Sequence, residues 1–121
     1  MGSYRVELGA ARVSQILQGK EVRVISVTRD TPVLEMIRLM ADEHTGSVLV
    51  MQGSELIGIA TGRDYARKVI LQGRSSADTP VHQIMSSPVT CVTSNQTVQD
   101  CMEIMTDRHV RHLPVKDGGQ V

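Results

Sequence analysis

Aromatic side chains are almost absent from this chain of 121 residues, which has two tyrosines, no phenylalanine and no tryptophan. Proteins that bind single-stranded nucleic acid stack the bases on aromatic rings, so the composition argues against such a platform. Thirteen lysines and arginines balance thirteen aspartates and glutamates. A net charge of zero gives no electrostatic reason to expect DNA, RNA or an anionic membrane as a partner.

Long apolar runs are also missing, because no stretch reaches the roughly 18 residues that a membrane-spanning helix needs. The N-terminus does not show the pattern of a secretory signal peptide. The two cysteines, Cys91 and Cys101, have neither metal-site spacing nor a C-x-x-C motif. Two free thiols fit a reducing compartment, so we expect a cytoplasmic protein.

Signatures of catalysis are absent as well. The chain has four histidines, His44, His82, His109 and His112, but no Ser/His/Asp or Cys/His arrangement with a family signature. His109 and His112 are not accompanied by a cysteine or carboxylate at metal-site spacing. No glycine-rich phosphate loop occurs. We therefore expect neither enzymatic activity nor a metal site.

The most informative stretch is residues 58–64, Gly-Ile-Ala-Thr-Gly-Arg-Asp. It follows an alternating apolar segment and precedes a helical pattern at residues 65–71, which predicts the end of a strand and the start of a helix. Backbone N–H groups and the helix dipole favour an anion at such a turn. Thr61 adds a hydroxyl, Arg63 a guanidinium, and Asp64 a carboxylate that can accept hydrogen bonds from a ribose diol. Together these groups predict a nucleotide site.

A structural role is the alternative for two of these residues. Thr61 and Asp64 also match the [ST]-x-x-[DE] capping box, in which the two side chains satisfy the backbone donors of a helix start. The spacing alone is compatible with both roles.

Periodicity places further elements along the chain. The expected strands are residues 22–27, 48–51, 56–60, 89–92 and 112–115. The expected helices are a short one within residues 4–20, then 33–43, 65–71, 81–85 and about 98–105. Asp30-Thr31-Pro32 has the composition of a helix start, and Thr97 with Asp100 forms a second possible capping box.

These elements repeat without a gap, because Val27 lies 65 positions before Val92 and the same offset joins many similar residues. The matched pairs include Val33 with Val98, Met40 with Met105, His44 with His109, Val50 with Val115, and Gly53 with Gly118. We expect a first repeat at residues 10–73, a linker with a short helix at 74–88, and an incomplete second repeat at 89–121.

Taken together, the T-P-V helix start, the G-S-V-L-V strand, the G-I-A-T-G-R-D turn and R-H-L-P-V in the second repeat resemble the cystathionine-β-synthase (CBS) domain. Two in tandem resemble a Bateman module, and the resemblance covers residues 10–121. It implies an α/β (α+β) fold of two β-α-β-β-α repeats about a pseudo-twofold axis. The second repeat would lack its last strand and helix.

The resemblance also implies an adenine-nucleotide site. Asp64 would bind the ribose hydroxyls, with Thr61 and Arg63 facing the ribose and phosphate. The implied adenine pocket consists of Ile59, Val89 and Thr90. The residues that would complete the site are Val110, Arg111, His112 and Pro114, with phosphate contact from Arg111 and His112. Gly46 and Ser47 stand at the positions equivalent to Arg111 and His112, so we expect one site rather than two.

The function that follows is a regulatory sensor of AMP, ADP, ATP or an NAD-type dinucleotide, in signal transduction. By family analogy it would form a homodimer and act on a downstream protein. The alternative is a ligand-independent module for protein–protein interaction and dimerisation.

Overall fold

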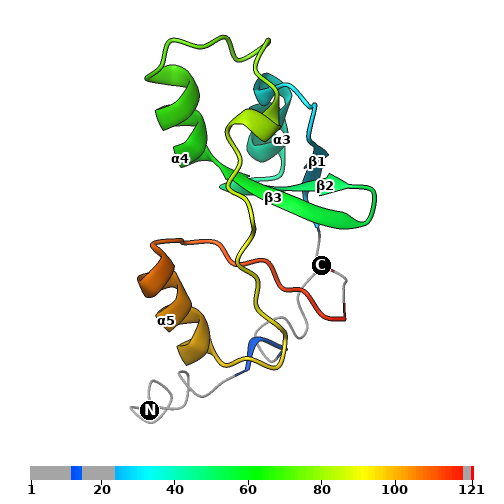
Figure 1. Ribbon diagram of the computed structural model, residues 1–121, viewed down its shortest axis with the longest axis vertical. Coiled ribbons are helices and arrows are strands. Elements are labelled where there is room, and N and C mark those ends of the chain that lie inside the picture. Colours follow the sequence, from blue (N-terminus) through cyan, green and yellow to red (C-terminus); the bar gives the residue numbers. More distant parts are fainter. Residues whose placement is uncertain (1–11, 15–23, 119–120) are drawn as a thin grey trace. The chain divides into compact units, whose positions relative to one another are not determined.

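The computed structural model describes residues 12–14, 24–118 and 121, and the chain divides into two compact units (Figure 1). The central unit is Val24–Val89. The terminal unit combines the two ends of the chain, Met1–Arg23 and Thr90–Val121. Each unit is described by itself.

The central unit is mixed α+β, as predicted. Its sheet has the order β1-β2-β3, formed by β1 (Ser26–Thr28), β2 (Ser47–Gln52) and β3 (Glu55–Thr61). β1 and β2 are parallel and joined through α3 (Val33–Asp42), whereas β2 and β3 form an antiparallel hairpin. Gly53 takes φ +61° in the hairpin turn, a left-handed conformation that glycine adopts without strain.

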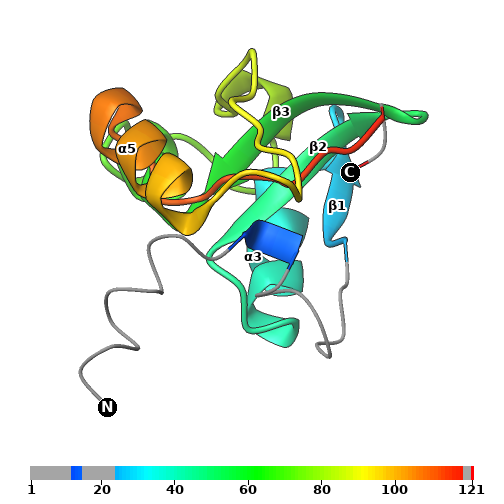
Figure 2. The same ribbon diagram turned by 90° about the horizontal axis from the view of Figure 1, so that it is seen from below.

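The helices of this unit cover one face of its sheet (Figures 1 and 2). Val33, Met36 and Met40 are the buried residues of α3, at the spacing of one helical stripe. Val48 and Val50 alternate along β2 toward the same core. The core is completed by Ala60, Val69, Val81 and Ile84.

The start of α3 differs from the prediction. Pro32 itself occupies the cap position, without a side-chain hydrogen bond to the helix. The Thr31 hydroxyl instead accepts a hydrogen bond from the Thr28 backbone N–H at 3.1 Å. Asp30-Thr31 therefore closes the turn after β1 and does not cap the helix.

The segment after residue 78 closes the outer edge of β3. It begins with η2 (Val81–Gln83), a single 3₁₀ turn where the sequence predicts a helix to residue 85. Ser86 N donates to Ile59 O at 2.8 Å, and Ile59 N donates to Ser86 O at 3.1 Å. Gly58 allows this approach, because a Cβ there would overlap the Met85 side chain.

In the terminal unit, α5 (Val98–Arg108) begins with the predicted Thr97–Asp100 capping box. The strands predicted at 89–92 and 112–115 are wrong, since the described chain forms only one parallel bridge there, between Val92 and Val115. Its hydrogen bonds run from Val92 N to Pro114 O at 2.9 Å and from Lys116 N to Val92 O at 2.8 Å. Pro114 has no N–H to donate, which limits further pairing.

The N-terminal predictions fall largely outside the described residues. The helix expected within residues 4–20 lies there except for residues 12–14, and so do the first two residues of the strand expected at 22–27. The strand that is described, β1, begins at Ser26. Within the described residues, no helix combines the length and the apolar character needed to cross a bilayer.

The internal repeat is confirmed by backbone geometry. Parallel pairing joins Val27 to Val50 in the central unit and Val92 to Val115 in the terminal unit, at the predicted offset of 65. The same offset relates the left-handed residues, His44 (φ 53°) to His109 (φ 56°) and Gly53 (φ 61°) to Gly118 (φ 57°). The boundaries at 10–73, 74–88 and 89–121 stay a prediction.

Candidate functional site

The turn from β3 into α4 (Gly62–Tyr65) is the centre of the predicted site. Asp64 N donates to Thr61 Oγ1 at 3.1 Å. In return, Asp64 Oδ2 accepts from Thr61 N at 3.0 Å and from the Thr61 hydroxyl at 3.1 Å. The capping box is therefore formed, and Thr61 and Asp64 have a structural role whether or not a ligand binds.

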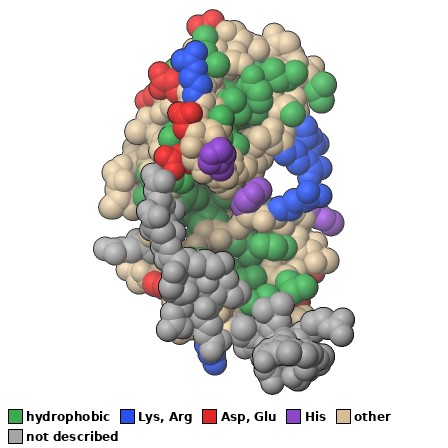
Figure 3. Space-filling model, turned by 180° about the vertical axis from the view of Figure 1, so that it is seen from behind, with side chains coloured by type: hydrophobic (Ala, Val, Ile, Leu, Met, Phe, Trp, Pro, Cys, Tyr) green, Lys and Arg blue, Asp and Glu red, His purple; other side chains and the backbone are tan. Residues whose placement is uncertain are grey.

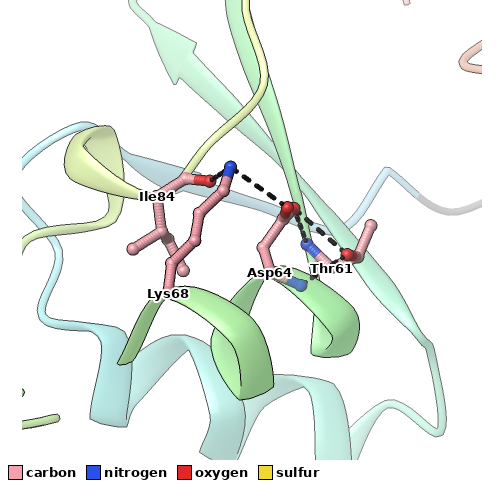
Figure 4. A network of polar contacts seen from close by, with 4 residues as sticks. All are labelled: Thr61, Asp64, Lys68 and Ile84. Atoms are coloured by element: carbon pink, nitrogen blue, oxygen red, sulfur yellow. Dashed lines mark hydrogen bonds and ion pairs between the residues drawn. The ribbon is translucent and has the colours of Figure 1, made fainter. Parts of the chain in front are cut away.

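The second oxygen of Asp64 faces a lysine (Figure 4). Lys68 Nζ lies 3.3 Å from Asp64 Oδ1 and donates a hydrogen bond to Ile84 O at 2.9 Å. The Asp64 side chain is 16% exposed and that of Lys68 is 45% exposed. The carboxylate is thus held by Thr61, which precedes α4, on one side and by a solvent-exposed cation on the other.

Lys68 belongs to η1 (Ala66–Ile70), a π-helical turn that continues α4. Its wider ring is closed by Leu71 N, which donates to Ala66 O at 3.0 Å. π-Helical turns are rare and occur frequently at functional sites. This one places a lysine beside the carboxylate that the sequence singles out.

The backbone donors at this turn are less available than the sequence suggests. Gly62 N donates to Gly46 O at 3.2 Å, and Asp64 N is used in the capping box. A phosphate would therefore depend on side chains more than on these N–H groups. Arg63 is exposed and carries the charge that such a contact needs.

The predicted site residues are divided between the two units. Ile59, Thr61, Arg63 and Asp64 lie together on β3 and α4, and Ile59 is half-buried. Val89 ends the central unit. The predicted residues of the terminal unit are Thr90, Val110, Arg111, His112 and Pro114. That the two groups bind one ligand stays a prediction.

The terminal-unit residues lie after α5. His109 ends the helix in the left-handed conformation, and Val110 N donates back to Met105 O at 3.1 Å. This closure directs the chain away from the helix. Arg111 and His112, which follow, are both exposed, whereas Pro114 is buried and pairs through its carbonyl with Val92.

The other titratable and nucleophilic side chains of the described residues form no metal-binding cluster and no reactive thiol. The described residues contain no group of three His, Cys, Asp or Glu side chains that could hold a metal ion. Burial raises the pKa of the Cys91 and Cys101 thiols, the latter helped by the nearby Asp100 carboxylate. Both thiols therefore stay protonated at neutral pH and are weak nucleophiles.

Acidic, basic and hydrophobic side chains all reach the molecular surface shown in Figure 3.

Sequence reasoning missed the Lys68 contacts. An acidic residue four positions before a lysine is a recognised signal for an ion pair on a helix, and Asp64 with Lys68 has this spacing. The contact with Ile84, sixteen residues further on, has no comparable signal because it depends on how the chain folds back.

Comparisons with known proteins agree with this architecture. A family model for the CBS domain matches residues 19–70 and 81–121. A mitochondrial CBS domain-containing protein of Arabidopsis thaliana is 40% identical in an alignment of 100 residues, and the match covers 78% of this chain. The match covers 48% of the plant protein, so the chain spans about half of its length.

Solved structures show the same fold. A protein with CBS domains from Burkholderia ambifaria is 44% identical, with a TM-score of 0.87 over 91% of this chain and 83% of that one. A CBS domain protein from Pyrobaculum aerophilum, complexed with AMP, has a TM-score of 0.79 over 91% of this chain and 82% of that one. It is 21% identical, so that likeness concerns the fold alone. Since the family model matches the chain twice, this protein belongs to the CBS domain family and carries a tandem pair of repeats.

Proposed function

We propose that this protein is a regulatory module that binds an adenine nucleotide, with the carboxylate of Asp64 accepting hydrogen bonds from the ribose. The observation that carries the proposal is the state of this carboxylate. It is 16% exposed and oriented by two hydrogen bonds from Thr61 to Oδ2, while Oδ1 forms an ion pair with the exposed Lys68. An oriented, nearly buried acceptor loses little freedom when a hydroxyl binds.

The other groups of the site follow from the chemistry of a nucleotide. Arg63 is placed beside Asp64 in the sequence and is exposed, so it can approach a phosphate. The half-buried Ile59, Val89 and Thr90 would contact the adenine. The family resemblance implies that residues of the terminal unit complete the site, namely Val110, Arg111, His112 and Pro114.

The nucleotide we would test first is AMP, because a protein of the same fold has been solved in complex with it. ADP, ATP and NAD(H) share the adenosine group and belong to the same proposal. A nucleotide regulates such a module only through its different affinities for two conformations of the chain. We propose that this module has a regulatory role and no catalytic one, and that it passes the signal to a downstream protein. We also propose that it forms a homodimer.

Calorimetric titration tests the ribose contact with a control that the repeat provides. Asp64→Asn and Asp100→Asn each weaken one capping box, since Asp100 Oδ2 accepts from Thr97 N at 3.0 Å as Asp64 Oδ2 accepts from Thr61 N. We expect Asp64→Asn to weaken AMP binding by about 10-fold or more, the value of a hydrogen bond to a charged group. Asp100→Asn should leave the affinity unchanged. Equal losses in both variants, or no binding by the wild type, would contradict the proposal.

A ligand-independent pairing module is the second candidate. Two neighbouring hydrophobic residues, Ile70 and Leu71, are 55% and 76% exposed, and Met102 on α5 is 55% exposed. Contiguous exposed apolar surface can mark an interaction site, and Ile70 and Leu71 are adjacent in the chain. Sedimentation of the wild type and Leu71→Asp, with and without AMP, distinguishes the two. A dimer that ignores AMP and is lost in Leu71→Asp favours the pairing module.

A further inference from the structure

Lys68 shares the Asp64 carboxylate with the proposed ligand. Its ammonium lies 3.3 Å from Asp64 Oδ1 and donates to Ile84 O at 2.9 Å. Figure 4 shows the lysine spanning the distance between the two acceptors. The family resemblance assigns no role to this residue, and its contact with Ile84 is visible only in the folded chain.

The carboxylate has too few free acceptor positions for both the lysine and a diol. Two carboxylate oxygens offer about four lone-pair positions in total. Asp64 Oδ2 already accepts from Thr61 N and from the Thr61 hydroxyl, and Oδ1 faces Lys68. About one position remains, whereas a ribose presents two vicinal hydroxyl groups. The second hydroxyl therefore requires that one existing partner withdraws.

Lys68 is the partner that withdraws at the lowest cost. The two contacts with Thr61 measure 3.0 and 3.1 Å and belong to the helix cap, whereas the Lys68 contact measures 3.3 Å. The lysine side chain is 45% exposed, so water can solvate the ammonium after it leaves. Its hydrogen bond to Ile84 O does not depend on the carboxylate and gives the ammonium a second partner.

We propose that Lys68 is a specificity-determining residue that competes with the second ribose hydroxyl for Asp64 Oδ1. The inference rests on the proposed nucleotide site at Asp64. Lys68 thereby limits how strongly the site prefers a ribonucleotide, with two vicinal hydroxyls, to a 2′-deoxyribonucleotide, with one. The positive charge of Lys68 also attracts the phosphate, but this effect is the same for both nucleotides and cancels in the ratio of their affinities.

The test measures the dissociation constants of AMP and 2′-deoxy-AMP by calorimetry on the full chain. Lys68→Met keeps the aliphatic stem and removes the competing charge. We expect the preference for AMP to rise about twofold, the usual value of an exposed ion pair at this spacing. Lys68→Gln is a second neutral variant, and Lys68→Arg should retain the wild-type ratio. Arg67→Met removes an exposed charge from the neighbouring position and should also leave the ratio unchanged.

The outcomes separate this inference from the proposed function. If the wild type prefers AMP but the ratio is unchanged or lower in both neutral variants, the role of Lys68 is refuted and the nucleotide site stands. If the wild type binds neither nucleotide, or if neither the wild type nor the neutral variants distinguish AMP from 2′-deoxy-AMP, the ribose contact at Asp64 is refuted and the inference falls with it. Circular dichroism of each variant confirms that the ratio is measured on folded protein.

Discussion

The two repeats share a backbone plan but stabilise it in different ways. Parallel pairing, helix start and left-handed residues coincide at an offset of 65. In the central unit, α3 buries Val33, Met36 and Met40, whereas no residue of α5 is buried. The two units therefore share turn geometry and pairing register but differ in how deeply their helices are buried.

The helix starts show the complementary difference. α5 begins with a capping box, in which Thr97 and Asp100 exchange hydrogen bonds of 3.0 Å in both directions. α3 begins at Pro32 with no side-chain cap, although it has the more deeply buried face. A side-chain cap therefore supports the helix that packs less, whereas burial stabilises α3 without one.

Truncating the matched methionines should give the largest difference between the repeats. Met40→Ala removes a side chain that is 7% exposed in the core, and we expect a loss of about 2–5 kcal/mol in the free energy of unfolding. Met105, at the equivalent position on α5, is half-buried. Met105→Ala should therefore reduce the free energy of unfolding by clearly less. Urea denaturation followed by circular dichroism measures both. Equal losses would show that α5 is packed as well as α3.

Removing the cap of α5 should have a moderate effect. Thr97→Ala deletes the hydroxyl that accepts from Asp100 N at 3.0 Å, and we expect a loss of about 1 kcal/mol. Thr106→Ala is the matched control on the same helix, because the exposed Thr106 hydroxyl donates to the Met102 carbonyl one turn earlier and does not cap the helix start. Thermal melts compare the two variants. A Thr97→Ala protein as stable as the control would contradict the role of the cap.

The smallest expected effect concerns pH. Asp117 Oδ1 accepts from Ser94 N at 2.9 Å, and this hydrogen bond lowers the pKa of the carboxyl group. The central unit has Gln52 at the equivalent position, which does not titrate. Because the pKa is lower in the folded state, the stabilisation is complete above the unfolded pKa of about 3.9 and is lost as the pH falls through the folded value.

Asp117→Asn should flatten the acid side of the stability profile slightly. Asp107→Asn replaces an exposed carboxylate on α5 and serves as the control. Melting temperatures between about pH 5 and pH 2.5, together with an NMR titration of the Ser94 amide, measure the effect. If the pH dependence of the melting temperature is the same in Asp117→Asn as in the wild type, Asp117 does not contribute to the difference between the units.

Local signals in the sequence were sufficient for much of the fold. The stripe of α3, both capping boxes and the turn glycines act over three or four residues, so their outcome depends little on distant chain. The strand predictions at 89–92 and 112–115 were wrong because β-branched residues indicate only a preference for extended backbone. A strand also needs a partner along its length. In the described part of the chain, the pairing around Pro114 is the single bridge with Val92.

The candidate site divides in the same way. Thr61 and Asp64 could be found because they interact with each other across three residues. Lys68 was within reach of spacing rules, but its second partner, Ile84, is sixteen residues away. The hydrogen bond from Gly62 N to Gly46 O could not be predicted from the sequence either. Because it occupies a backbone donor, the expected phosphate contact shifts from the backbone to Arg63.

The pairing of Ser86 with Ile59 protects the edge of β3 and therefore affects the tendency of this protein to aggregate. A strand whose outer edge is unpaired can recruit a strand from another molecule, and the backbone bonds at Ile59 occupy that edge. The arrangement depends on the missing side chain of Gly58, against which Met85 packs. A substitution such as Gly58→Val would release this segment and open β3 to intermolecular pairing. Its damage should therefore appear as concentration-dependent aggregation before any loss of helix content.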